Sequence, residues 1–307
     1  MSNKHVLSIY DLGTETVSKL VDRSLEFASG ATPSSFTGKT VGLYFRGSST
    51  RTRTSFTVGA MKLGANVVTY GPNDLQISTG ETIDDSARVL SGYLDAIVIR
   101  TNRSDAEMRA FSAQDRMSIV NAMSELEHPT QAIADLSALK EKLGRLDGVH
   151  ILYFGEGNNT AGSLALAVAL TPRMRLTLVT PEGYGLPEEL LAKSLKLAEQ
   201  SGSVIEQQHD LDSLPKVDAV YTARWQTMGE PKKDADWLDK FRPYCVTPAL
   251  MARVSKESGT IFMHDLPAVR GGDVRDEVLD GPQSIAFRQA EHKLFSAMAV
   301  LEWCLTG

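Results

Sequence analysis

The chain has 307 residues, a formal net charge of −6 at pH 7, and 42% hydrophobic and 23% charged residues. This length predicts two domains, each large enough to bury its own core. The negative charge argues against nucleic acid or an anionic membrane as the main partner. The two cysteines have no metal or redox spacing, which indicates a cytoplasmic protein. The lack of a signal-peptide core and of a membrane-length apolar run agrees with this expectation.

The first part of the chain predicts alternating strands and helices. Residues 40–45 (TVGLYF) form an apolar run typical of a buried parallel strand, and residues 55–63 then show apolar side chains at helical spacing. By the same patterns we expect helices at 17–27, 82–93 and 128–144, and strands at 66–70, 95–100 and 118–122.

The alternation restarts after a turn-rich segment at 145–148 (RLDG). Here we expect strands at 149–154, 175–179, near 204 and at 217–221, and helices at 161–170, 188–200 and 287–305. The pattern predicts an α/β fold with two parallel-sheet domains, residues 1–145 and 146–286. The position of the last helix leaves open a return to the first domain.

The turn from the first strand into the next helix, FRGSSTRTRTSF at 45–56, carries the clearest anion-binding signal. Residues 47–53 of this turn hold four hydroxyls and two guanidiniums, namely Ser48, Ser49, Thr50, Thr52, Arg51 and Arg53. A helix N-terminus offers unpaired N–H groups and partial positive charge, and an arginine fork beside hydroxyl donors fits a phosphate. The alternative is a capped helix with two solvated arginines.

Ligands of open parallel sheets bind outside the carboxyl ends of the strands, and this rule selects five further segments. They are Arg100–Thr101, His128–Gln131, Glu156–Thr160, Thr222–Gly229 and His264–Pro267. His128 can donate to an oxygen, and Gln131 lies one turn later on the same helix face. A solvated Arg100 and a His128 that merely caps its helix are the structural alternatives.

The glycine-rich segment GEGNNTAG at 155–162 could also indicate a dinucleotide-binding turn, because glycines follow a strand and open a helix. However, Thr160 occupies the third glycine position, and no acidic residue clearly ends the next strand. His264 and Asp265 have no partners at metal-ligand spacing, so we expect no metal site. Nothing in these segments calls for an organic cofactor.

Taken in order, these segments resemble the aspartate and ornithine carbamoyltransferases. The shared pieces are SSTRTR, the strand-ending Arg100-Thr101, HPTQ, the Gly-Asn-Asn turn, the Tyr-Thr…Met-Gly segment and His-x-Leu-Pro, which together span residues 45–267. The terminal QAEHKLFSAMAVLEW is similar to the last helix of that family, which implies that residues 287–307 return to the first, carbamoyl-phosphate-binding domain. GEGNN, WQTMGE and FRPYCVTPALM are closer to the ornithine branch.

The resemblance implies a carbamoyl-phosphate site and a reaction without a side-chain nucleophile. Ser49, Arg51 and Thr52 would hold the phosphate, while Thr50, Arg100 and His128 would face the carbonyl oxygen. Gln131 and the backbone around Leu266 would hold the carbamoyl NH2, and Lys293 takes the place of an arginine near the carbamoyl group. The family forms trimers with shared active sites, so Gln76 would serve a neighbouring subunit.

The second domain, which would bind the amino acid, departs from the ornithine branch. The residues expected there are Asn158, Asn159, Arg224, Gln226, Thr227, Met228 and Asp265. Asp265 replaces a cysteine of the ornithine enzymes and Ala223 replaces an aspartate, while Arg224 and Gln226 are similar to a carboxylate-binding pair of the aspartate branch. We therefore expect an acceptor other than ordinary ornithine, such as a 2,3-diaminopropionate-like amine, with Asp265 also able to take the amine's proton.

Four alternatives remain open from the sequence. Two lie within the family: an ornithine carbamoyltransferase of arginine metabolism and an aspartate carbamoyltransferase. The third is a nucleotide-binding oxidoreductase, which rests on the GEGNN turn. The fourth is a catalytically silent sensor of a phosphorylated metabolite.

Overall fold

The computed structural model describes residues 4–226, 232 and 234–306. Internal contacts divide the chain into unit 1, which runs to Ser137 and resumes at Glu291, and unit 2, which comprises Ala138–Ala290. Each unit contains one fully parallel sheet, so the predicted pair of parallel-sheet α/β domains is confirmed. The division falls within the helices α5 (Pro129–Leu143) and α11 (Ala286–Leu305), and the expected domain limits at 145 and 286 stay predictions.

Unit 1 is built on a four-stranded sheet in the order β2-β1-β3-β4. Its strands are β1 (Thr40–Phe45), β2 (Asn66–Tyr70), β3 (Ala96–Arg100) and β4 (Ser118–Met123). β1 and β3 are almost wholly buried, as expected of central strands that are covered on both faces. The expected strand limits agree with these bounds to within one residue.

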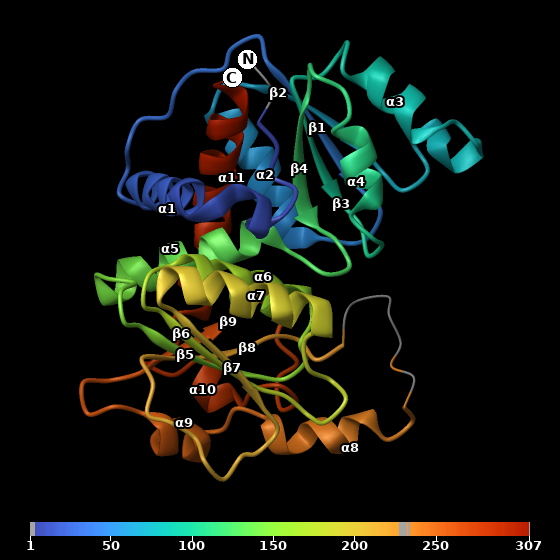
Figure 1. The fold of residues 1–307 in the computed structure, drawn as a ribbon. Coiled ribbons are helices and arrows are strands. Elements are labelled where there is room, and N and C mark those ends of the chain that lie inside the picture. The colour runs from blue at the N-terminus through green and yellow to red at the C-terminus, as the bar shows by residue number, and fades with distance from the viewer. Residues whose placement is uncertain (1–3, 227–231, 233, 307) are drawn as a thin grey trace. The chain divides into compact units, whose positions relative to one another are not determined.

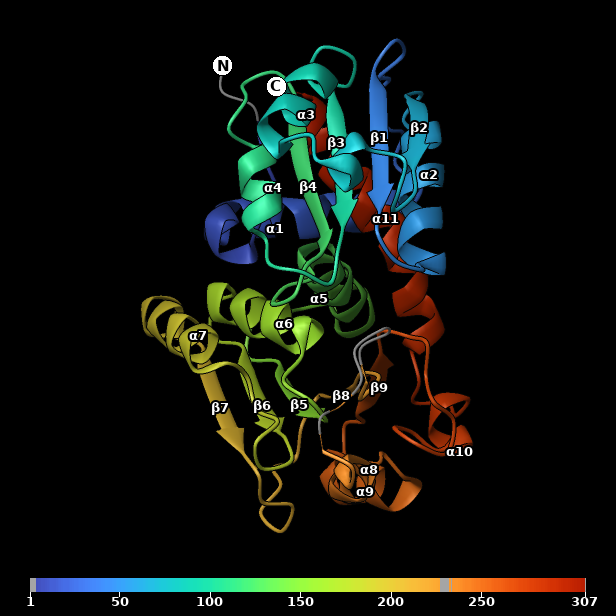
Figure 2. The same cartoon turned by 90° about the vertical axis from the view of Figure 1, so that its right-hand side faces the viewer.

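Helices cover both faces of this sheet. They are α1 (Ile9–Ala28), α2 (Thr50–Lys62), α3 (Ile83–Leu90) and α4 (Ala106–Phe111), together with α11. In Figures 1 and 2, α1, α2 and α11 lie on one face and α3 and α4 on the other. A Cβ added to Gly59 of α2 would lie 3.3 Å from the side chain of Met298 in α11, so the two helices pack closely. The predicted return of the C-terminal helix to the first domain is confirmed.

Unit 2 is built on a five-stranded sheet in the order β7-β6-β5-β8-β9. The strands are β5 (His150–Phe154), β6 (Arg175–Val179), β7 (Val204–Gln208), β8 (Ala219–Thr222) and β9 (Ile261–His264). The helices are α6 (Asn159–Leu170), α7 (Glu188–Ser201), α8 (Trp237–Phe241), α9 (Pro248–Val254) and α10 (Asp276–Leu279). α6 and α7 cover one face, and α9 and α10 cover the other (Figure 2).

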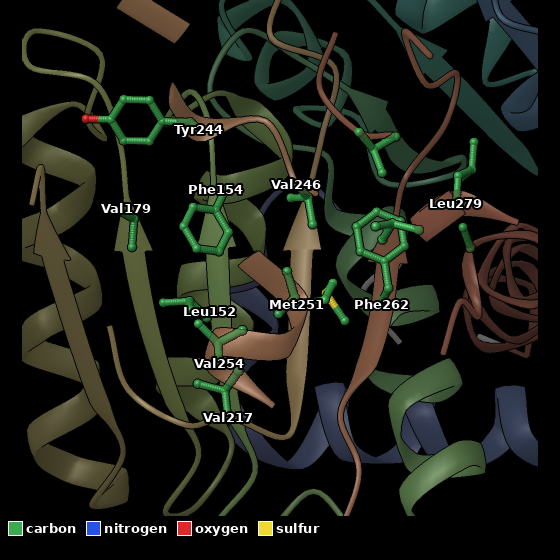
Figure 3. Packing of buried hydrophobic residues seen from close by; sticks show 14 residues of the cluster. Leu152, Phe154, Val179, Val217, Tyr244, Val246, Met251, Val254, Phe262 and Leu279 are labelled. Carbon is green, nitrogen blue, oxygen red and sulfur yellow. The ribbon is translucent and has the colours of Figure 1, made fainter. Parts of the chain in front are cut away.

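The core of unit 2 lies between its sheet and the segment that contains α9 and α10 (Figure 3). Leu152 and Phe154 of β5 and Phe262 of β9 are fully buried there against Met251 and Val254 of α9. Alternate residues of a strand point to the same face, which is why Leu152 and Phe154 reach this core together. The central strands are thus fixed from both sides.

Several elements differ from the sequence prediction. α2 begins at Thr50 and not at residue 55, and α1 begins at Ile9, with Gly13 at φ 69° interrupting its helical dihedral angles. The polar loop expected after β2 contains a 3₁₀ turn, η1 (Gln76–Thr79). The helices α4, α8, α9 and α10 were not predicted, because segments of four to seven residues are too short to display a helical period.

None of the helices in the described part of the chain is long and apolar enough to cross a membrane.

The packing of β9 generates a stability prediction. Phe262→Ala removes a ring that is 0% exposed, and it should lower the free energy of unfolding by about 3–5 kcal/mol. Phe287→Ala, at a position 55% exposed in the same unit, should change it by less than about 0.5 kcal/mol. Urea unfolding of both variants measures the difference, and equal losses would contradict the described packing.

Candidate active site

The topology of unit 1 creates a branch point at the carboxyl edge of its sheet. The chain passes from β1 outward to β2 and then returns to β3 on the other side of β1. The segments that follow β1 and β3 therefore leave the sheet in opposite directions, which opens a crevice at this edge. The predicted phosphate-binding turn follows β1, and Arg100 is the last residue of β3.

The start of α2 has the features of an anion site. Ser49 is the N-cap residue in an extended conformation, and its side chain makes no capping hydrogen bond to the helix. The first turn contains Arg51 and no acidic residue. Because α2 starts five residues earlier than predicted, Thr50, Arg51 and Thr52 belong to its first turn, where free N–H groups and the helix dipole favour a negative charge.

Three predicted residues lie buried in unit 1 and close to one another, and one of them contacts this turn. Arg100, His128 and Lys293 have exposed fractions of 8%, 4% and 6%, although they come from β3, the residue preceding α5, and α11. The Nη1 of Arg100 donates to Oγ1 of Thr52 at 3.3 Å, which connects β3 to the first turn of α2. Burial and then the positive charges of Lys293 and Arg100 hold the pKa of His128 well below its usual value. The lowered pKa favours the neutral imidazole form of His128.

The side-chain amide of Gln131 is held at both ends. Its Nε2 donates to Oδ1 of Asp135 at 2.7 Å, one helical turn further along α5, and its Oε1 accepts from Nζ of Lys293. These contacts fix which end of the amide faces the cation. Asp135 was missed by the sequence analysis, although its i, i+4 spacing from Gln131 is a signal that could have found it.

Two predicted residues of the first domain have a different setting. Gln76 is exposed, and the hydrogen bonds described for it stay within residues 76–81, where its side-chain oxygen accepts from Thr79 at 2.6 Å. Arg53 is also exposed, and its guanidinium lies 5.1 Å from the ring centroid of Phe45. The side chain of Arg53 therefore packs on Phe45.

Unit 2 has the same kind of branch point, between β5 and β8. The chain moves from β5 through β6 to β7 and then returns to β8 on the other side of β5. Asn158 follows β5 and caps α6, because its Oδ1 accepts from the backbone N–H groups of Thr160 and Ala161 at 3.0 and 3.1 Å. Its Nδ2 donates to the carbonyl oxygen of Arg224, after β8, at 3.4 Å. The two loops at this edge are thus linked by one asparagine.

The close approach of the loops requires glycine at two positions. Gly155 has φ 120°, and a Cβ there would lie 2.9 Å from the ring of Trp225. A Cβ on Gly157 would lie 2.3 Å from the backbone nitrogen of Leu186. These two glycines serve the packing of the loops, which explains a glycine-rich turn without a dinucleotide.

Asp265 lies next along the same edge, directly after β9. Its Oδ2 accepts a hydrogen bond from the hydroxyl of Thr160 at 2.9 Å, and its Oδ1 is buried without a hydrogen-bond partner among the described residues. Buried polar atoms in this state are uncommon in native proteins. Arg224 nearby also has a buried Nε without a described partner. Both atoms remain available to a ligand.

Glu156, in the same turn, is already engaged. Its carboxylate pairs with Nζ of Lys232, which lies 5.3 and 5.4 Å from the ring centroids of Tyr184 and Phe241. Burial raises the pKa of Glu156, against the opposing effect of Lys232. This ion pair and Thr160 were both missed as site features by the sequence analysis.

The remaining predicted residues of the second domain are only partly described. Asn159 is buried, and Gln226 is half-buried beside Trp225. Thr227 and Met228 lie outside the described residues. Leu266 has φ 53°, and its backbone N–H donates to Nδ1 of His264 at 2.8 Å. Within the described chain, no group of three or more His, Cys, Asp or Glu residues could hold a metal ion.

Comparison with known families gives two matches that together cover nearly the whole chain. Residues 4–141 match the family described as "Aspartate/ornithine carbamoyltransferase, carbamoyl-P binding domain". Residues 147–304 match "Aspartate/ornithine carbamoyltransferase, Asp/Orn binding domain". The first match contains the start of α2, Arg100 and His128, and the second contains Lys293 and the Asp265 edge of unit 2.

Individual proteins agree with this assignment. An ornithine carbamoyltransferase from Methanothermobacter thermautotrophicus is 38% identical over 304 residues, covering 98% of this chain and 99% of its own length. The solved ornithine carbamoyltransferase from Pyrococcus furiosus has a TM-score of 0.91 at 33% identity, covering 100% of this chain and 98% of that chain. Aspartate transcarbamoylase from Trypanosoma cruzi, in complex with aspartate and phosphate, has a TM-score of 0.84 at 28% identity, covering 99% and 97% of the two chains. The chain therefore belongs to the aspartate/ornithine carbamoyltransferase family of enzymes.

Proposed function

We propose that this enzyme transfers the carbamoyl group of carbamoyl phosphate to the amine of an amino acid that carries a second N–H donor. The amine forms a new C–N bond to the carbonyl carbon, the C–O bond to phosphate breaks, and the amine's proton leaves with the phosphate. The observation that carries the proposal is the grouping of the buried Arg100, His128 and Lys293, with Arg100 bonded to Thr52 at the start of α2. No side-chain nucleophile is needed, because positioning and charge stabilisation lower the barrier.

The phosphate of the donor fits the first turn of α2. Ser49 and Thr52 offer hydroxyls, Arg51 offers a planar fork, and the helix start offers N–H groups. Charge builds up on the leaving phosphate as the C–O bond breaks, so these groups bind the transition state more tightly than the substrate.

The carbonyl oxygen would meet Thr50, Arg100 and His128. A neutral His128 can donate one N–H without losing its proton, and the low pKa produced by burial and the neighbouring cations supports that state at pH 7. Arg100 brings the positive charge that a developing oxyanion needs.

The carbamoyl NH2 requires acceptors. Gln131 offers Oε1, which has a second lone pair beside its bond from Lys293. The N–H of Leu266 is used by His264, so the group that this residue can offer is its carbonyl oxygen. Lys293 occupies the position of the family's arginine. It would orient Gln131 through their hydrogen bond and place a positive charge near the carbamoyl group.

The acceptor would bind at the edge of unit 2. The carboxylate would be received by Asn158, Asn159, Arg224 and Gln226, and the buried Nε of Arg224 is a fitting donor for it. Thr227 and Met228 would also bind the amino acid. Ala223 is buried and offers no charge, while Asp265 presents a carboxylate oxygen without a described partner. A diamino acid such as 2,3-diaminopropionate satisfies both groups, with Asp265 holding the second amine.

Ornithine is the second candidate acceptor, because the relatives described above carry the name ornithine carbamoyltransferase. Against it, the second amine of ornithine lies at the far end of the chain, so Asp265 would face the reacting amine itself and favour its charged ammonium form, which cannot attack. Aspartate is disfavoured, because Asp265 would repel its second carboxylate. We also propose a cytoplasmic homotrimer, or a multiple of it, with no membrane or nucleic-acid partner.

Removing Arg51 should weaken the binding of carbamoyl phosphate. The loss of one charge-assisted phosphate contact costs about 2–3 kcal/mol, or about thirty- to a hundred-fold in Kd. Arg53→Ala is the matched control, since Arg53 lies in the same turn but is exposed beside Phe45. Calorimetry with both variants tests this, and an Arg51→Ala protein that binds as tightly as Arg53→Ala would refute the phosphate assignment.

A shared active site predicts complementation between subunits. If Gln76 serves a neighbour, Arg51→Ala and Gln76→Ala chains should each be nearly inactive alone, but mixed oligomers should recover part of the activity in hybrid sites. Assays after denaturation and joint refolding measure this recovery. Properly mixed oligomers without recovery would mean that each subunit completes its own site.

Acceptor preference should follow the residue at position 265. We expect wild type to use 2,3-diaminopropionate with a higher kcat/KM than ornithine or aspartate, and Asp265→Cys to shift the preference toward ornithine. Steady-state release of phosphate with each acceptor measures both. Ordinary efficiency of wild type with ornithine would overturn the acceptor proposal and leave carbamoyl transfer itself intact.

A further inference from the structure

Thr160 and Asp265 are in contact, and each of them replaces a different residue type expected at its position. Thr160 stands where a dinucleotide-binding turn would have its third glycine, and Asp265 stands where the ornithine branch has a cysteine. The structure brings them together, with the Thr160 hydroxyl donating to Oδ2 of Asp265 at 2.9 Å. A hydroxyl that donates to a carboxylate makes a charge-assisted bond, stronger than one between neutral groups.

Thr160 is held rigidly enough to fix its partner. It is 3% exposed, and its backbone N–H is bound by the capping side chain of Asn158 at 3.0 Å. As the second residue of α6 it has no preceding helical carbonyl to which its hydroxyl could donate, so the hydroxyl is free to serve Asp265. Its branched Cβ also restricts rotation about χ1. The orientation of the Asp265 carboxylate is thus set by the start of α6.

The second oxygen of Asp265 lacks a donor. The side chain is 17% exposed, and Oδ1 is buried without a described hydrogen-bond partner. Nδ1 of His264 lies 3.5 Å from Oδ1, but this nitrogen accepts from the Leu266 N–H and therefore presents a lone pair. Two acceptor atoms consequently face each other. A donor from outside the described chain would relieve this arrangement.

We infer that Thr160 is a specificity-determining positioning residue, which orients Asp265 so that Oδ1 binds the non-reacting amine of the acceptor. This inference rests on the proposed carbamoyl transfer. The ligand group has the chemistry of an ammonium, which supplies N–H donors and a positive charge to a fixed carboxylate oxygen. An acceptor that lacks this second amine leaves Oδ1 unsatisfied and is used less well.

Two acceptors that differ only in this group provide the test. 2,3-Diaminopropionate and β-alanine share the reacting amine, the chain length and the carboxylate, and β-alanine lacks the second amine. Wild type should prefer 2,3-diaminopropionate in kcat/KM. Thr160→Val keeps the shape and removes the hydroxyl, and it should raise the KM for 2,3-diaminopropionate at least about tenfold, while the KM for β-alanine changes little.

Two controls separate positioning from folding. Thr160→Ser restores the hydroxyl and should recover most of the preference. The KM for carbamoyl phosphate should be unchanged in both variants, because the groups proposed to hold its phosphate and its carbonyl oxygen are in unit 1. If Thr160→Val raises the KM for both acceptors equally, or retains the wild-type preference, the inference is wrong. If wild type carbamoylates no amine at all, it is the proposed function that fails.

Discussion

The order of the strands is the constraint on which both candidate sites depend. In each unit the chain starts in a central strand, winds outward on one side and returns on the other, so two adjacent strands send their following segments apart. In unit 1 these segments are the start of α2 and the end of β3, and in unit 2 they are the Gly155–Thr160 turn and the segment after β8. The strand order alone therefore brings any polar residue that follows these strands to the crevice. Catalytic chemistry then becomes a matter of which side chains occupy a few positions.

The two sites differ in the sign of their charge. Unit 1 gathers buried cations and a neutral histidine around a helix start, which suits an anionic donor whose charge increases during the reaction. Unit 2 presents Arg224 and Asp265 along one edge, which suits an acceptor that carries both a carboxylate and an ammonium group. The contrast explains why a chain with a formal net charge of −6 can still bind a phosphorylated substrate: the local charge decides the ligand.

Much of the fold could be predicted from the sequence, because parallel strands are continuous apolar runs and their helices have a clear period. The bounds of β1, β2 and β6 agree with the prediction, whereas the start of α2 was placed five residues late because its first turn is entirely polar. Most site residues were found by their position after strands. Asp135 and Thr160 were missed because their importance lies in the groups they hold, Gln131 and Asp265, and such pairings depend on tertiary contacts. The partner of Glu156, Lys232, is 76 residues away in the chain, and no local pattern connects them.

The central claim is that one carbon atom passes from phosphate to an amine. Carbamoyl phosphate labelled with ¹³C at the carbonyl, incubated with the enzyme and 2,3-diaminopropionate, tests it directly by NMR. The account predicts that the labelled carbon appears in a ureido group in a one-to-one ratio with released phosphate, and only when the amine is present. Phosphate release without a labelled ureido product, or at the same rate without the amine, would contradict it.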